Sequence, residues 1–84
     1  MNQYVERLQH ITAELPRPEL PTDRSFRGFF HKRGTYRGKA RYLIGYSWTR
    51  VGAHYAMGRV YDVVLGYGDG FDAALENAKA RAAA

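Results

Sequence analysis

The sequence predicts an α+β fold, in which one helix at each end of the chain flanks a three-stranded antiparallel sheet. Two observations predict it: apolar residues recur at helical spacing near both ends, and between them apolar and polar residues alternate with a period of two. A chain of 84 residues without cysteine forms one domain that depends on its hydrophobic core. We expect a single domain, 1–84, with an N-terminal helix (1–15), an extended Pro-rich linker (16–25), the sheet (26–67) and a C-terminal helix that packs on it (70–83).

The N-terminal helix is predicted over residues 3–14, because Asn2 can cap its first turn. The apolar residues that follow at helical spacing are Tyr4, Val5, Leu8, Ile11 and Leu15. The segment PRPELP, residues 16–21, ends the helix, since proline lacks a backbone N–H and disfavours helical backbone in the residue before it. We expect this segment to be an extended, semi-rigid connector.

The first two strands are predicted as a hairpin around a turn that contains Gly34. The alternate apolar residues, which we expect to face the core, are Phe26, Phe30, Ala40, Tyr42, Ile44, Tyr46 and Trp48. Successive side chains of a strand point to opposite faces. The opposite face then carries Arg27, His31, Arg33, Arg37, Lys39 and Arg41. A solvated face normally mixes both signs of charge, so this face favours a ligand that neutralises it.

The last third of the chain predicts a third strand and a helix. Residues 53–65 fit a helical stripe and a strand face equally well, but we favour a strand over 59–67, where RVYDVVLGY is rich in β-branched and aromatic residues. GYGDG, residues 66–70, is expected to be a turn. The apolar stripe of the final helix is Phe71, Ala74, Leu75, Ala78 and Ala82.

Positive charge is concentrated in the middle of the chain. Residues 24–61 contain nine Lys or Arg and no Asp or Glu, whereas the segments before and after them each carry a net charge of −2. This asymmetry indicates a polyanionic partner. The longest purely aliphatic run is Val63–Leu65, which argues against a transmembrane helix and against the apolar core of a secretory signal. We therefore expect a soluble, cytoplasmic protein without a membrane partner.

The function predicted from this pattern is nucleic-acid binding, with duplex DNA favoured. A two-stranded ribbon fits the major groove, where arginine pairs with guanine, and each phosphate contact by Lys or Arg releases condensed counterions. The residues expected to bind are Arg27, His31, Arg33, Arg37, Lys39, Arg41 and Arg50. Tyr36 and Phe29 stand among these charges and could stack on unpaired bases, so RNA or a single strand is a further alternative.

A second hypothesis is a protein-interaction module. A short basic protein with an amphipathic first helix could belong to a phage or another mobile element and inhibit a host protein or nucleoprotein complex, as an antitoxin or anti-defence inhibitor does. Arg and Tyr are enriched in the hot spots of protein interfaces. The partner would be an acidic protein or nucleoprotein surface, and a homodimer is a further option.

An enzyme is not expected. His10, His31 and His54 are the candidate acid–base groups for neutral pH. No nucleophile motif surrounds them, and three scattered histidines do not form a metal-ligand spacing. We therefore predict no catalytic residue, no metal and no cofactor.

Three segments carry a resemblance to a known family. FRGF (26–29), GKARYLIGY (38–46) and RVYDVVLGYGDGFDAALENAKARA (59–82) resemble the strands and alanine-rich helix of the DNA-binding domains that include the plant ethylene-response-factor domain and the N-terminal domain of some transposon and phage integrases. The resemblance implies a sheet face in the major groove, with base and phosphate contacts from Arg27, Arg33, Arg37, Lys39 and Arg41. Trp48 departs from that pattern, because it alternates onto the apolar face here.

The closing helix is also similar to that of HicB-type antitoxins. The match is ALENAK, residues 74–79, although Gly70 stands where that family has threonine in the turn. Both resemblances support the fold more than the function.

Overall fold

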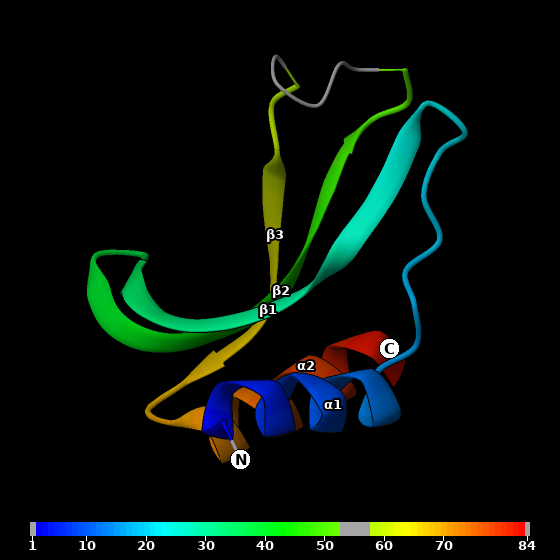
Figure 1. Ribbon diagram of the computed structural model, residues 1–84. Coiled ribbons are helices and arrows are strands. Elements are labelled where there is room, and N and C mark those ends of the chain that lie inside the picture. Colours follow the sequence, from blue (N-terminus) through cyan, green and yellow to red (C-terminus); the bar gives the residue numbers. More distant parts are fainter. Residues whose placement is uncertain (1, 53–57, 84) are drawn as a thin grey trace.

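The computed structural model describes residues 2–52 and 58–83. It confirms the α+β fold: a helix, an open three-stranded antiparallel sheet, and a C-terminal helix that packs on the sheet. The elements are α1 (Gln3–Glu14), β1 (Arg24–Tyr36), β2 (Lys39–Arg50), β3 (Tyr61–Gly68) and α2 (Phe71–Ala83) (Figure 1). β2 lies between β1 and β3. The strand predicted in the ambiguous region is confirmed from Tyr61 onward, while residues 53–57 lie outside the described residues.

α1 begins and ends where the sequence predicts. The Oδ1 atom of Asn2 accepts a hydrogen bond from the backbone N–H of Tyr4 at 2.8 Å, which satisfies one of the orphan donors of the first turn. At the other end Leu15 is extended, with φ −110° and ψ 135°, as expected before Pro16. Its N–H donates to the carbonyl of Ile11 at 2.9 Å, and the side chains of both residues are buried.

β1 and β2 join through the two-residue turn Arg37–Gly38. Both residues have positive φ, 53° and 75°, as in the tight hairpin turn whose twist matches that of the flanking strands. Tyr36 pairs with Lys39 across this turn. From Gly28 to the turn, odd-numbered residues of β1 therefore stand opposite even-numbered residues of β2 and share a face with them.

This turn makes the predicted basic face wrong. His31 pairs with Ile44, and Arg33 pairs with Tyr42. Both basic residues therefore lie on the face that carries the core, while Lys39 and Arg41 of β2 lie on the opposite face. The prediction assumed that odd positions of both strands share a face, which a two-residue turn does not allow.

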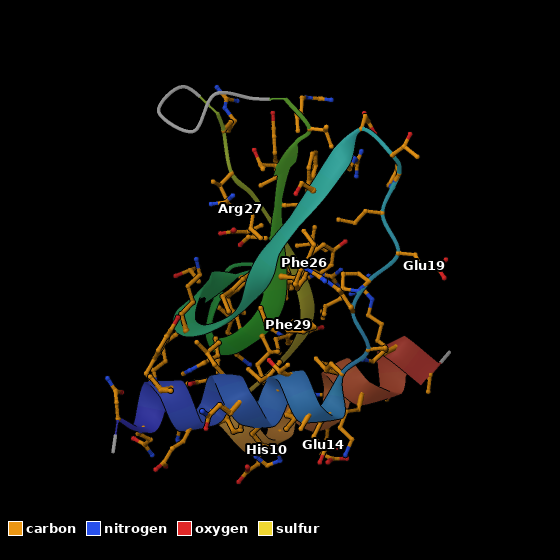
Figure 2. The ribbon with its side chains drawn as sticks, turned by 45° about the vertical axis from the view of Figure 1, so that its right-hand side comes forward. His10, Glu14, Glu19, Phe26, Arg27 and Phe29 are labelled. Carbon is orange, nitrogen blue, oxygen red and sulfur yellow. The ribbon has the colours of Figure 1, made fainter. Side chains whose placement is uncertain are left out.

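A β-bulge changes the phase of β1 near its start. The register shifts between Phe26 and Gly28, so Arg27 is the extra residue of the bulge. As a result, Phe26 and Phe29 lie on the same face of β1, toward α1 and the segment that follows it (Figure 2). Strict alternation would have placed these two rings on opposite faces.

The face away from the helices has apolar contacts of its own. Phe30, expected in the core, lies on this face and covers Gly45, where an added Cβ would come within 2.7 Å of the phenyl ring. Leu43 lies on the same face and is only 5% exposed, and its Cα partners are Lys32 and Tyr67. Apolar residues are therefore divided between the two faces of the hairpin.

β3 runs to Gly68, and only Asp69–Gly70 separates it from α2. Gly66 and Gly68, expected in the turn, thus belong to the strand. A Cβ added at Gly66 would lie 2.4 Å from the carbonyl oxygen of Ala74, and one at Gly68 would lie 2.8 Å from the Cβ of Ala73. These two glycines allow α2 to lie directly against β3.

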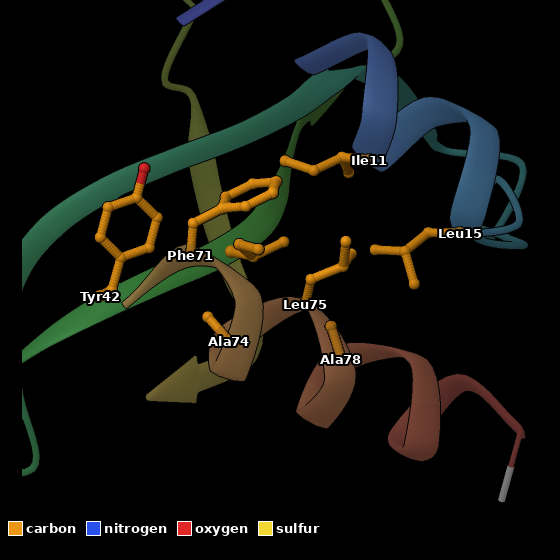
Figure 3. Close-up of a cluster of buried hydrophobic side chains, with 8 residues drawn as sticks. Ile11, Leu15, Tyr42, Phe71, Ala74, Leu75 and Ala78 are labelled. Atoms are coloured by element: carbon orange, nitrogen blue, oxygen red, sulfur yellow. The ribbon is translucent and has the colours of Figure 1, made fainter. Parts of the chain in front are cut away.

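The core lies between one face of the sheet and the two helices (Figure 3). Its buried residues are Ile11, Leu15, Tyr42, Ile44, Phe71, Ala74, Leu75 and Ala78. The apolar stripe predicted for α2 is confirmed except at Ala82, which is exposed. α1 and α2, from opposite ends of the chain, therefore share one core.

Candidate nucleic-acid interface

The sheet has one face that the helices cover, the helix face, and one that they do not, the open face. The helix face carries Tyr42 and Ile44, which belong to the core, and Gly66 and Gly68, which approach α2. The residues of the open face are Phe30, Lys32, Gly34 and Tyr36 of β1, Lys39, Arg41, Leu43, Gly45 and Ser47 of β2, and Asp62, Val64 and Tyr67 of β3.

His31 does not lie with the other basic residues on an exposed sheet face, where the prediction placed it. It is only 6% exposed, on the helix face. Its Nε2 lies 3.1 Å from the carbonyl oxygen of Tyr4, which can only accept, so Nε2 donates. In the tautomer that carries its proton on Nε2, Nδ1 accepts from the hydroxyl of Tyr42, which itself accepts from Nη1 of Arg7 at 3.1 Å. His31 therefore joins α1 to the hairpin.

Three further predicted residues lie apart from one another. Arg33 is at the rim of the helix face, where its Nη1 donates to the carbonyl oxygen of Asp69 at 3.5 Å. Arg50, at the other end of β2, forms an ion pair of 3.6 Å with Asp23. Arg27 is exposed at the bulge. These three positions do not form one surface.

The structure brings the other three predicted cations together at the end of the hairpin, beside two tyrosines. The guanidinium of Arg37 lies over the ring of Tyr36 at 5.4 Å, and that of Arg41 lies over the ring of Tyr67 at 4.5 Å. The centroids of the two rings are 5.2 Å apart. We call Tyr36, Arg37, Lys39, Arg41 and Tyr67 the hairpin-end cluster.

The three cations of this cluster form no ion pair with a carboxylate among the residues that the structure describes. Other cations are paired: Lys32 with Asp62 at 3.6 Å, and Lys79 with both Glu76 at 3.3 Å and Glu14 at 3.4 Å. Hydrogen bonds to Glu76 and Glu14 raise the pKa of Lys79, which shows the effect of a nearby carboxylate. The hairpin end thus carries three cations that no carboxylate of the described residues pairs with.

A pocket of about 320 Å³ adjoins the cluster. The last pair between β2 and β3 is Tyr42 with Gly68, so the hairpin continues past the end of β3 (Figure 1). The residues that line the recess at this point include Lys39, Arg41, Tyr67, Asp69, Ala73 and Asn77. It is therefore built from β2, β3, α2 and the short turn between the last two.

The pocket offers both donors and acceptors. The Nε atom of Arg41 is buried and has no hydrogen-bond partner in the described part of the chain, and Lys39 adds a second cation. Nδ2 of Asn77 donates to the carbonyl of Tyr67 at 2.7 Å, which leaves its Oδ1 as an acceptor. Asp69 adds further acceptor oxygens. A ligand that carries both negative charge and donor groups would match this lining.

Sequence reasoning found Tyr36 but missed Tyr67, Asp69 and Asn77. The first two of these three lie in the glycine-rich segment that was expected to be a turn, and Asn77 lies on the polar side of α2. No local pattern connects them to Lys39, because the pairing of β3 brings them together. Phe29, predicted with Tyr36 as a stacking residue, instead packs at the margin of the core.

Comparisons of the chain with protein-family models, with curated proteins and with solved structures find no match. Among the described residues, no group of three or more His, Asp or Glu side chains could hold a metal ion. No helix of that part of the chain is long and apolar enough to cross a membrane. The function must therefore be argued from the geometry of the hairpin end.

Proposed function

We propose that this protein binds nucleic acid and that the hairpin-end cluster is its contact surface. One observation supports the proposal: three cations without a carboxylate partner among the described residues stand beside two tyrosine rings in mutual contact. Like charges held close together repel one another. The phosphates of a nucleic acid would relieve this repulsion, and the rings would add contacts to sugars or bases.

The proposal predicts a salt dependence. If Arg37, Lys39 and Arg41 each neutralise one phosphate, the logarithm of the binding constant should fall with the logarithm of the salt concentration, with a slope of roughly −2 to −3. Fluorescence anisotropy of labelled oligonucleotides measures this slope. The ligands should be duplex DNA, single-stranded DNA and RNA, each titrated at several salt concentrations.

Binding to duplex DNA, which the sequence favours, stays a prediction within this proposal. The hairpin end is a two-stranded ribbon, an element that the major groove admits. Arg37 lies at its tip, in the turn. The duplex arm of the same titration tests this mode.

The site is tested by the triple substitution of Arg37, Lys39 and Arg41 by serine. We expect binding to weaken by at least about tenfold, because each phosphate contact contributes to affinity. The melting temperature should change less than in a core variant, since Arg37 and Lys39 are exposed and Arg41 is half-buried outside the core cluster. The matched control replaces Arg50, Arg59 and Arg81 by serine, which removes the same charge from exposed positions elsewhere. Equal losses in the two variants would mean that only net charge matters and that the site is misplaced.

The protein-interaction hypothesis is an outcome of the same assay. If the folded protein binds none of the three nucleic acids at low salt, the proposed function is wrong. The basic hairpin end would then favour an acidic protein or nucleoprotein surface, as expected of an inhibitor from a phage or mobile element.

A further inference from the structure

We infer that the pocket beside the hairpin-end cluster holds one unpaired ribonucleotide, so that single-stranded RNA is the preferred ligand. This inference rests on the proposed function and narrows its ligand class. Three features support it: the two kinds of polar group in the pocket, the contact between Tyr36 and Tyr67, and the volume of the pocket.

The cations of the pocket are arranged for one phosphate. Lys39 and Arg41 line the same recess. Arg41 is half-buried, and its guanidinium lies against the ring of Tyr67 at 4.5 Å. The ring holds the planar guanidinium in place, and a guanidinium held in this way can donate two parallel hydrogen bonds to phosphate oxygens.

The acceptors of the pocket indicate more than a phosphate. Asp69 lines the recess together with the two cations, and Asn77 contributes its Oδ1. A carboxylate beside a phosphate site is unfavourable unless the ligand brings a hydrogen-bond donor to it. The 2′-hydroxyl of ribose is such a donor, and it is the group by which a protein distinguishes RNA from DNA.

The aromatic contacts favour a base that is not paired. The ring of Tyr36 is half-buried and contacts that of Tyr67, with Arg37 and Arg41 on either side of the pair. Bases stack on tyrosine rings and on arginine guanidinium planes when they are splayed out of a helix. Inside a duplex the faces of the base are covered by its neighbours, so this contact requires a single strand, a loop or an end.

The volume agrees with one nucleotide. At about 320 Å³ the pocket stands at the lower end of the range of small-molecule sites, about 300–1,000 Å³. A base pair with its two backbones would not enter it. Phe30 and Lys32, further along the open face, with the ammonium 5.2 Å from the ring centroid, could meet the next nucleotide of the strand.

The test compares oligonucleotides of one sequence by fluorescence anisotropy: single-stranded RNA, single-stranded DNA, and the RNA and DNA duplexes. We expect the single-stranded RNA to bind at least about tenfold more tightly than either duplex. Tyr36→Leu should weaken binding of single-stranded RNA by about tenfold, the scale of one stacked base, and weaken binding of the duplexes clearly less. Leucine keeps the apolar contact and removes the flat ring, and a thermal melt verifies that the variant is folded.

Asp69→Asn tests the ribose contact. The loss of the negative charge should tighten binding of single-stranded DNA slightly. For RNA the weaker acceptor offsets this gain, so the affinities for single-stranded RNA and DNA should come to within about twofold of each other. Arg81→Ser is the control for a distant change of charge and should leave their ratio as it is. An Asp69→Asn variant that keeps the full RNA preference would overturn the ribose assignment.

Failure of this inference is distinct from failure of the proposed function. If duplexes and single strands bind equally, and the triple serine variant loses them all, the nucleic-acid function stands and the single-nucleotide pocket does not. The inference is also wrong if unlabelled polyphosphate competes as well as unlabelled RNA, because charge alone would then be recognised. If no nucleic acid binds the folded protein, both proposals fail.

Discussion

At the scale of single residues, His31 shows how one side chain can belong to a basic sequence segment and still be structural. It follows Phe30 and precedes Lys32 in the sequence, yet its ring lies 4.3 Å from that of Tyr4 and is stacked against that of Tyr42 at 5.9 Å. Both ring nitrogens are hydrogen-bonded. A buried, fully paired imidazole has no donor to spare for a phosphate, so its role is to attach α1 to the sheet.

The hydroxyl of Tyr42 is the centre of this network, which leads to a prediction. Tyr42→Phe leaves Nδ1 of His31 without its donor and Arg7 without its acceptor, so the free energy of unfolding should fall by about 1–3 kcal/mol. Urea denaturation followed by circular dichroism measures the change. Tyr46→Phe is the matched control in the same strand, since no hydrogen bond of its hydroxyl is part of this network, and it should change stability much less. A Tyr42→Phe variant as stable as the control would show that the network adds nothing to stability.

At the scale of elements, the sequence predicted which segments form helices and strands, but not how the strands face one another. α1 was predicted at residues 3–14 and is found there, because capping and proline are local signals. The faces of the hairpin depend instead on the length of its turn. The turn is at Arg37–Gly38, later in the chain than the expected turn at Gly34. With this turn, odd positions of β1 pair with even positions of β2, whereas the predicted basic face required odd positions to pair with odd positions.

The candidate site was also predictable only where its residues are related by local sequence. Lys39 and Arg41 were correctly placed on one face, because they lie two residues apart on one strand. Arg33 was placed with them incorrectly, because that relation crosses the turn. Tyr67 and Asn77 lie at the site because β3 pairs with β2 and α2 packs on the sheet. Local patterns in a single sequence do not predict such long-range contacts.

The contact between β3 and α2 predicts the effect of a small substitution. In Gly66→Ala, the new methyl group would lie 2.4 Å from backbone atoms of both Ala74 and Ala78. Since backbone cannot rotate away, α2 must shift from the strand, and we expect a loss of about 1–3 kcal/mol in the free energy of unfolding. Gly70→Ala is the control, because a Cβ there meets nothing within 4 Å. Equal stability of the two variants in a thermal melt would contradict the close packing.

At the scale of the whole molecule, the protein has a small hydrophobic core, to which both α1 and α2 contribute buried residues. α1 places Ile11 and Leu15 against Phe71, Leu75 and other buried residues of α2 and the sheet (Figure 3). A domain of this size has a free energy of unfolding of only about 5–15 kcal/mol. The core shared by both helices must therefore supply most of this small free energy.

Because the core is shared, we expect a substitution at a buried position of α1 to destabilise the whole domain. Ile11→Ala should lower the free energy of unfolding by about 2–5 kcal/mol, since the side chain is fully buried. Val5→Ala, on the same helix and 43% exposed, is the control and should cost much less. Trp48, the single tryptophan, lies outside the core cluster, where it stacks on Tyr61 at 4.4 Å.

Its fluorescence therefore reports on a part of the sheet outside the cluster that contains Ile11. If the domain unfolds as one unit, the transition seen by tryptophan fluorescence and that seen by circular dichroism should shift together in Ile11→Ala. A shift in circular dichroism alone would mean that α1 unfolds separately and that the sheet does not need it. In that case the basic hairpin would be stable without α1. The expectation that the sheet needs a core shared by both helices would then be wrong.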